Sequence, residues 1–191
     1  LIKKELHSTN NGTSFLQVVD YSYNIRGWLT KINDPSSLGT DKFAMQLNYD
    51  LISTTLTSKA NYNGNISEAI WRTKADTMHA YGYAYDDLNQ LSQATYAASL
   101  GASWTVNRDR FNETASYDLN GNIQSLIRGG KTNWTSNTFG TMDNLSYKYE
   151  GNKLMSLGDA IADIPQNQKY DFSDNTSELV YDASNANPPS T

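Results

Sequence analysis

The sequence predicts an all-β fold in which successive antiparallel hairpins lie side by side in a long, curved and twisted sheet. Apolar and polar residues alternate with the two-residue period of a half-buried strand, most clearly over 43–49. Short turn signals containing Gly or Asn separate such runs. No stretch has the spacing of a long amphipathic helix. An aromatic content of 12% with a hydrophobic content of 38% suits amphipathic sheets better than a thick apolar core.

The expected strands follow one another in chain order between these turn signals. A loop is expected after Asn33-Asp34-Pro35, and a loop or weak strand on the surface is expected over 51–60. A short helical turn is an option over 97–102, and 133–143 is predicted to be a long connection. The strands are expected over 1–6, 15–23, 28–32, 43–49, 66–73, 81–85, 91–96, 111–117, 123–127, 145–149, 154–157, 169–172 and 178–181.

A hairpin around Asn120-Gly121 sets the pattern for the chain. A two-residue type I′ turn needs positive φ at both central residues, which Gly adopts freely and Asn at low cost. Three registers are open. A turn centred on Asn120-Gly121 pairs Tyr117 with Gln124, and one centred on Gly121-Asn122 pairs Tyr117 with Leu126. A longer loop with a bulge is the third option.

The pattern of this hairpin, Tyr-Asp-x-x-Gly-Asn, recurs along the chain at intervals of roughly 25 to 37 residues, which is typical of repeat architectures. Some copies replace the Gly by Asn, others keep only the Gly-Asn pair, and the last has lost its Gly. The repeat positions are Tyr23, Gly27, Tyr62, Gly64, Asn65, Tyr85, Asn89, Tyr117, Asn120, Gly121, Asn122, Tyr149, Gly151, Asn152 and Tyr181.

This pattern resembles the YD repeats of the RHS (rearrangement hotspot) family, and the resemblance extends from about Tyr21 to Asp182. The segment 23–35 is especially similar to RHS-repeat surface proteins of Bacteroidetes. The resemblance implies a sheet that spirals into a hollow shell around a C-terminal toxin or effector, with this chain as a section of the wall. The family's autoproteolytic motif, Asp-Pro-x-Gly-Leu, is not assigned to 34–38, because Ser37 stands where the motif has Gly.

We expect one continuous repeat region over 1–184, as a fragment of a larger protein, and a flexible tail over 185–191. The resemblance implies a secreted or cell-surface protein of a bacterial envelope. This segment contains no signal peptide, and none of its apolar runs approaches the ~20 residues that span a bilayer.

Charge and cysteine content exclude several classes of partner and site. The net charge is −5 and the pI is about 4.9, with no basic run, so nucleic acid is not an expected partner. The chain has no Cys, which excludes disulfides and thiolate metal sites.

The sequence predicts no catalytic residue, no cofactor and no metal site. His7 and His79 lie in no cluster with the spacing of a metal site or a nucleophile. The segment 118–122 superficially resembles a calcium loop, but strand residues follow at once where the ligand pattern would continue. The acidic pairs Asp86-Asp87 and Asp174/Glu178 are expected to be solvated turn residues rather than glycosidase carboxylates. We therefore expect a protein that is not an enzyme.

The aromatic residues divide into two groups. Tyrosines at a fixed place before each turn are expected to pack in one layer, because cross-strand aromatic pairs stabilise sheets. Trp104 and Trp134 lie in expected connections, where an exposed ring can face a ligand.

The functional expectation is a structural scaffold whose partners are the remainder of the same polypeptide. Its open sheet edges are expected to permit self-association. The alternative is a module at the cell surface that binds a glycan or another surface protein.

Overall fold

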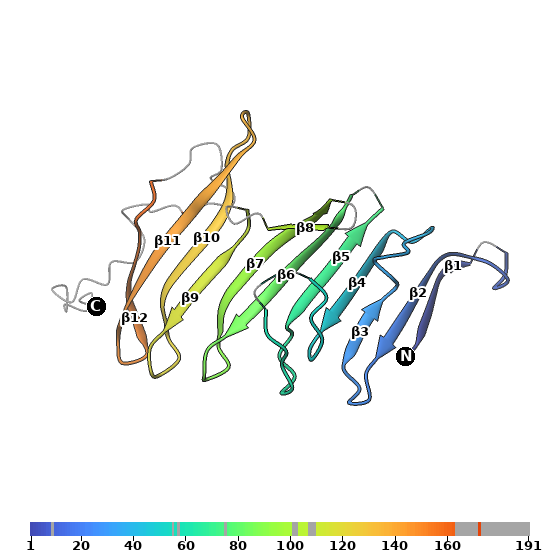
Figure 1. The fold of residues 1–191 in the computed structure, drawn as a ribbon, viewed down its shortest axis with the longest axis horizontal. Helices are drawn as coiled ribbons and strands as arrows, with labels where there is room; N and C mark the ends of the chain where they lie inside the picture. Colours follow the sequence, from blue (N-terminus) through green and yellow to red (C-terminus); the bar gives the residue numbers. More distant parts are fainter. Residues whose placement is uncertain are drawn as a thin grey trace, which may run out of the picture. The chain divides into compact units, whose positions relative to one another are not determined.

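The computed structural model describes residues 1–8, 10–54, 56, 58–74, 76–100, 103–106, 110–162 and 172. These residues form strands and turns and no helix, so the predicted all-β fold of antiparallel hairpins is confirmed (Figure 1). The strands are β1 (Lys3–Ser8), β2 (Phe15–Tyr23), β3 (Leu29–Ile32), β4 (Phe43–Asn48), β5 (Glu68–Thr73), β6 (Met78–Tyr85), β7 (Leu91–Leu100), β8 (Ser103–Val106), β9 (Glu113–Tyr117), β10 (Ile123–Asn133), β11 (Thr138–Glu150) and β12 (Lys153–Asp159).

The chain divides into two compact units. Unit 1 comprises 1–84 and 94–107, and unit 2 comprises 85–93 and 108–191. In unit 1 the strands from β1 to β6 and the part of β7 from residue 94 onward are hydrogen-bonded in chain order, and β8 folds back onto β7. In unit 2 the strands from β9 to β12 follow one another in the same way (Figure 1). Neighbours along the chain are thus neighbours in each sheet, as the repeat pattern predicts.

Several predicted boundaries are wrong. The helical option over 97–102 fails because β7 continues to Leu100 and pairs with β8. The predicted connection over 133–143 is mostly strand, since β10 runs to Asn133 and β11 begins at Thr138. The strands expected over 169–172 and 178–181, and the tail over 185–191, lie outside the described residues except for Phe172. The prediction of one region over 1–184 stays a prediction.

The two faces of the sheet in unit 1 differ in chemistry. The side that we call the covered face carries Ile70, Ala80 and Ala97, which form a buried cluster with Leu56. Leu56 belongs to the segment 51–60, which was expected to be a loop or weak strand on the surface. Leu51 and Ile52 are exposed as expected, but Leu56 is buried on this face. At Gly82 an added Cβ would lie 2.7 Å from Leu56 Cβ, so only Gly leaves room for the loop.

The opposite side, the aromatic face, carries stacked rings from three strands. The residues alternate with those of the covered face, because successive side chains of a strand point to opposite sides. Ring centroids lie 5.6 Å apart for Trp71 and Tyr81 and 5.9 Å apart for Tyr81 and Tyr83, with nearly parallel planes. Tyr96 packs edge-on against Tyr81 at 5.6 Å.

The alternation predicted for β4 is confirmed, but the polar side of this strand is buried more deeply than the apolar side. Ala44 and Asn48 are buried, whereas Phe43 is exposed and Met45 is half-buried. The reason is the loop over the covered face, which supplies polar partners to Asn48. Hydropathy alone could not predict that a polar loop would cover this side.

Candidate functional site

A single turn geometry occurs three times among the residues that the structure describes. In the turn that begins at Asp118, the Asp118 N–H donates to Asn122 O at 2.9 Å and the Gly121 N–H donates to Asp118 O at 3.0 Å. The Asp118 carboxylate accepts the N–H groups of Asn120 and Asn122 at 2.8 and 2.9 Å. The turns that begin at Asn24 and at Asp86 make the same set of bonds.

The fourth residue of each of these turns has a positive φ, which explains the Gly or Asn at that place. The angle is 78° at Gly27, 63° at Asn89 and 83° at Gly121. A β-turn followed by a residue in this conformation is the three-residue hairpin loop with a bulge. Tyr117 accordingly pairs with Ile123. The third register option, a longer loop with a bulge, is therefore the one observed.

The Asp118 carboxyl stays ionised because its acceptor sites are filled. The side-chain amide of Asn122 donates to Asp118 Oδ2 at 2.9 Å. That bond, together with the backbone bonds, outweighs desolvation and holds the pKa of Asp118 below its ordinary value. The segment 118–122 is thus a turn held by its own carboxylate, and its acceptors are used internally.

A tyrosine hydroxyl joins one hairpin to the preceding one, and we call this contact the inter-repeat bond. Tyr117, the last residue of β9, donates from its hydroxyl to Leu91 O at 2.8 Å. Leu91 is the first residue of the strand that follows the preceding turn. In unit 1, Tyr49 donates in the same way to Leu29 O at 2.9 Å, and Leu29 is the first residue of β3. Partial burial raises the pKa of both phenols, which keeps them protonated as donors.

Tyr49 is a repeat position that the sequence analysis missed, since the copy was assigned to Tyr62. Tyr62 lies in a loop and is 68% exposed. The signal at Tyr49 was available, because Asp50 follows it as Asp118 follows Tyr117. The next strand begins only at Glu68, so a long connection replaces the tight turn there and hid the match.

The other residues of the misassigned copy serve a different purpose. Gly64 has a φ of 102°, and a Cβ there would lie 3.3 Å from the Trp28 ring. Trp28 also packs against Tyr49, with ring centroids 5.1 Å apart, and the Arg26 guanidinium lies over its ring. The Asn65 N–H donates to Asn63 Oδ1 at 3.0 Å. This loop therefore wraps the indole.

The last described repeat has a shorter turn. Glu150 pairs with Lys153 across Gly151 and Asn152, and Gly151 has a φ of 60°. The Asn122 side chain donates to Asn152 Oδ1 at 3.2 Å, so two successive turns of unit 2 are in direct contact. Tyr149 is half-buried, as are Tyr85 and Tyr117, whereas Tyr23 is exposed. Tyr181 lies outside the described residues.

A buried carboxylate anchors the loop over the covered face of unit 1. Glu68 is fully buried and pairs with no cation among the described residues. Its Oε2 accepts the Asn48 amide at 2.7 Å and the Ser53 N–H at 2.8 Å, and its Oε1 accepts the Thr54 N–H at 3.1 Å. The Thr54 and Ser58 hydroxyls also donate to Oε1. Burial alone would raise the pKa of Glu68, but these bonds outweigh it and the pKa lies below the ordinary value.

On the aromatic face a histidine lies between an acid and a phenol. His79 Nε2 is 2.9 Å from Asp76 Oδ2, and His79 Nδ1 is 2.5 Å from the Tyr96 hydroxyl. The bond from His79 lowers the pKa of Asp76. No group that orients His79 was expected from the sequence, although the spacing Asp76-x-x-His79 was the signal for it. Tyr96 is buried within the ring stack, so this arrangement links the rings to one another.

Unit 2 contains a buried ion pair between directly paired residues of β10 and β11. Arg128 Nη2 lies 2.6 Å from Asp143 Oδ2, and Asp143 is fully buried. Asp143 Oδ1 accepts the Phe172 N–H at 2.8 Å. The pair thus links the two strands to a distant residue of the chain.

The two candidate ligand-facing tryptophans have different surroundings. Trp134 lies in the turn between β10 and β11, is 51% exposed, and has the Lys131 ammonium 4.3 Å from its ring centre. Trp104, on β8, is half-buried and packs against the cluster of Leu56, Ile70, Ala80 and Ala97. It also lines a hollow of about 320 Å³ on the covered face.

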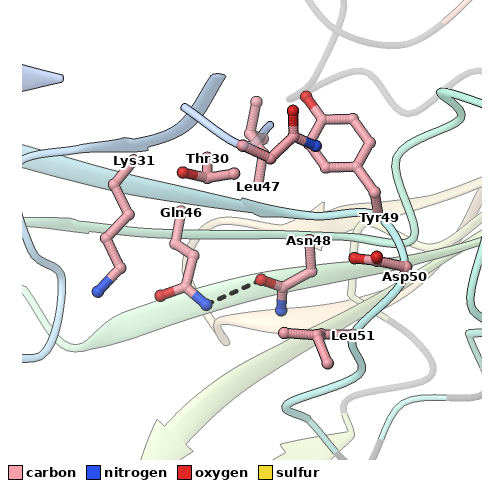
Figure 2. Close-up of a pocket in the computed structure, with 9 residues that line it drawn as sticks. Thr30, Lys31, Gln46, Leu47, Asn48, Tyr49, Asp50 and Leu51 are labelled. Carbon is pink, nitrogen blue, oxygen red and sulfur yellow. Dashed lines mark hydrogen bonds between the residues drawn. The ribbon is translucent and has the colours of Figure 1, made fainter. Parts of the chain in front are cut away.

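A second hollow, of about 270 Å³, lies where β3 and β4 separate. These strands pair only at Lys31 with Gln46 and at Ile32 with Met45. Figure 2 shows Gln46 and Asn48 on one side of β4, joined by a hydrogen bond of 2.8 Å, with Leu47 and Tyr49 on the other side.

Of the acidic pairs considered as glycosidase carboxylates, the structure describes only Asp86-Asp87. Asp86 is used by its own turn, and Asp174 and Glu178 lie outside the described residues. No group of three or more His, Asp or Glu that could hold a metal ion occurs among the residues that the structure describes. The described residues also include no helix with the length and apolar character needed to cross a membrane.

Comparison with known proteins adds no assignment. No protein-family model matches the chain, and no curated protein matches it.

Proposed function

We propose that this chain is a non-enzymatic structural scaffold, a section of an RHS-repeat shell of a secreted or surface-exposed bacterial protein. In this proposal the shell encapsulates or presents a C-terminal toxin or effector domain. The observation that carries the proposal is the inter-repeat bond, made by Tyr49 in unit 1 and by Tyr117 in unit 2. In both units the tyrosine hydroxyl donates to the carbonyl at the equivalent backbone position of the preceding repeat. Such a bond joins each hairpin to the one before it in a continuous sheet.

The energetics of hairpins support a role that depends on neighbours. An isolated two-stranded hairpin is barely stable in water, and repeat proteins gain stability from contacts between adjacent units. The turns at Asp118 and Glu150 touch through Asn122 and Asn152, so adjacent repeats meet at their turns as well as along their strands. Further repeats of the same polypeptide are therefore the first partners that we propose.

The scaffold is tested in the parent polypeptide that carries this segment and a C-terminal domain. Limited proteolysis should leave that domain uncut while the wall is intact. A Tyr49→Phe, Tyr117→Phe double variant removes both hydroxyls and should expose the domain to cleavage at lower protease concentration. A Tyr23→Phe variant is the control, because Tyr23 holds the same place before a turn but is exposed. Equal cleavage of all three proteins would refute the scaffold.

We also propose self-association through the edge strand β1, the first strand of unit 1. The Tyr21 N–H donates to Ile2 O at 2.9 Å, which makes these residues a hydrogen-bonded pair. Because such pairs alternate along an antiparallel ladder, the backbone groups of Lys3 and Glu5 point away from β2. They are available to pair with another strand.

A proline at Glu5 tests this edge directly. Glu5→Pro removes an outward N–H while leaving the bonds to β2 in place. Light scattering should show oligomers of the unmodified chain and of Glu5→Gln that dissociate in Glu5→Pro. A chain that stays monomeric at all concentrations would contradict self-association.

The second candidate function is binding of a glycan or of another surface protein. The exposed ring of Trp134 and the hollow beside Trp104 favour it. A glycan array should then give hits that quench tryptophan fluorescence. An array without hits, and fluorescence that no ligand changes, would remove this candidate.

A further inference from the structure

The hollow beside Trp104 brings together side chains from six separate parts of unit 1. Its lining includes Ile70 of β5, Met78 of β6, and Pro35 and Ser36 of the β3–β4 connection. The remaining lining residues are Gln46, Ser53 and Trp104, and none of the seven lining residues is charged. A volume of about 320 Å³ is at the small end of the range for small-molecule pockets.

The polar side of the hollow is oriented from within the protein. Glu68 can only accept, so Asn48 turns its amide nitrogen toward Glu68 Oε2 at 2.7 Å. This leaves Asn48 Oδ1 to accept from Gln46 Nε2 at 2.8 Å. The relay from Glu68 through Asn48 therefore fixes the Gln46 amide, and its carbonyl oxygen becomes the acceptor available to a ligand. Ser53, whose hydroxyl is 3.2 Å from Glu68 Oε2, is tied to the same carboxylate.

We propose that this hollow binds a neutral pyranose sugar, with the ring against Trp104 and a sugar hydroxyl donating to Gln46. A pyranose has one apolar C–H face, which fits an indole, and hydroxyl donors at its edge, which fit an oriented amide oxygen. A carboxylate or sulfate on the ligand would find no cation to pair with in the lining. This inference rests on the second candidate function, binding of a glycan, and places the sugar at Trp104 and not at Trp134.

Saturation-transfer NMR with glucose, galactose and N-acetylglucosamine tests the proposal on the full chain, with glucuronate as the charged comparison. At least one neutral sugar should bind, and glucuronate should bind more weakly than glucose. Trp104→Ala should weaken binding by about tenfold or more, because the sugar loses its apolar contact. Trp134→Ala should bind as the unmodified chain does.

Trp104 also packs on the core, so a second variant separates binding from folding. Gln46→Met keeps the size of the side chain and the alternation of β4 but removes the acceptor, and it should lose binding while its circular dichroism shows that the fold is retained. Its Tm should fall modestly, because Asn48 Oδ1 loses the bond from Gln46. Loss of binding in Trp134→Ala with retention in Trp104→Ala and Gln46→Met would overturn the proposal. So would the absence of binding by all the neutral sugars. The scaffold proposal is tested separately by protease protection, so the outcome of the sugar-binding experiment does not decide it.

Discussion

The Tyr117 hydroxyl lies 2.8 Å from the Leu91 carbonyl oxygen, across the boundary between one hairpin and the one before it. Tyr49 and Leu29 have the same relationship at 2.9 Å. The two tyrosines precede different connections, a tight turn after Tyr117 and a long loop after Tyr49. The contact between repeats is therefore independent of the length of the connection that comes next.

Tyr117→Phe removes this donor while keeping the ring. We expect the free energy of unfolding of unit 2 to fall by about 1 kcal/mol, the usual net value of one hydrogen bond. Urea denaturation followed by fluorescence measures it. Tyr23→Phe, at an exposed tyrosine before a turn, should change stability by less than about 0.5 kcal/mol. A loss as large at Tyr23 as at Tyr117 would contradict a specific role for the inter-repeat bond.

Glu68→Gln should destabilise unit 1 by about 2 kcal/mol or more, because an amide turns a donor toward groups that already donate to the carboxylate. Urea denaturation measures the loss. Glu113→Gln, at an exposed position, is the control and should leave the free energy of unfolding nearly unchanged.

The effect of Glu68 should also depend on pH. The pKa of Glu68 is lower in the folded protein than its ordinary value, so the unfolded chain binds the proton more readily. The carboxylate then contributes its full stability above the ordinary pKa, and this contribution is lost as pH falls through the lower, folded-state pKa. Tm measured from neutral to strongly acidic pH should show the gap between the unmodified chain and Glu68→Gln narrowing with acid. A gap that is constant with pH would show that the ionised carboxylate of Glu68 is not the source of this stability.

Gly121→Ala tests the positive φ of the repeated turn. An added Cβ would meet only Gln90 Oε1 at 3.5 Å, so the cost comes from the backbone angle of 83° and not from a clash. We expect a loss of about 1–2 kcal/mol in the free energy of unfolding. Gly158→Ala is the matched control in unit 2, since Gly158 has no positive φ and its nearest neighbour is 3.8 Å away. Equal losses at both glycines would argue against strain in the turn.

Arg128→Met leaves the fully buried Asp143 without its cation. We expect unit 2 to lose about 3 kcal/mol, the lower end for a broken buried ion pair, because Arg128 is partly exposed. The double variant Arg128→Met, Asp143→Asn should recover much of this loss, since no buried charge remains. Denaturant titrations of the unmodified chain, of both single variants and of the double variant give the coupling energy. A double variant no more stable than Arg128→Met would show that the charge is not the cause.

The strands and turns were predictable because each depends on a local rule. The turn at Asn120-Gly121 follows from the φ that Gly adopts, and the alternation of β4 follows from the strand period. The loop that covers Asn48 was not predictable, because its anchor, Glu68, is distant in sequence and looks like an ordinary surface acid. Tyr49 was missed for a related reason: the long loop after it conceals the repeat.

The separation of the tyrosine contact from the turn has a consequence for how such a chain can change in evolution. The tyrosines at 23, 49 and 85 are 26 and 36 residues apart, while those at 85, 117 and 149 are 32 apart. Residues can therefore be inserted into or deleted from the connection after a repeat tyrosine without disturbing the inter-repeat bond. Descendants of one ancestral unit are free to acquire new surface loops of different lengths, each a place where a new specificity can arise.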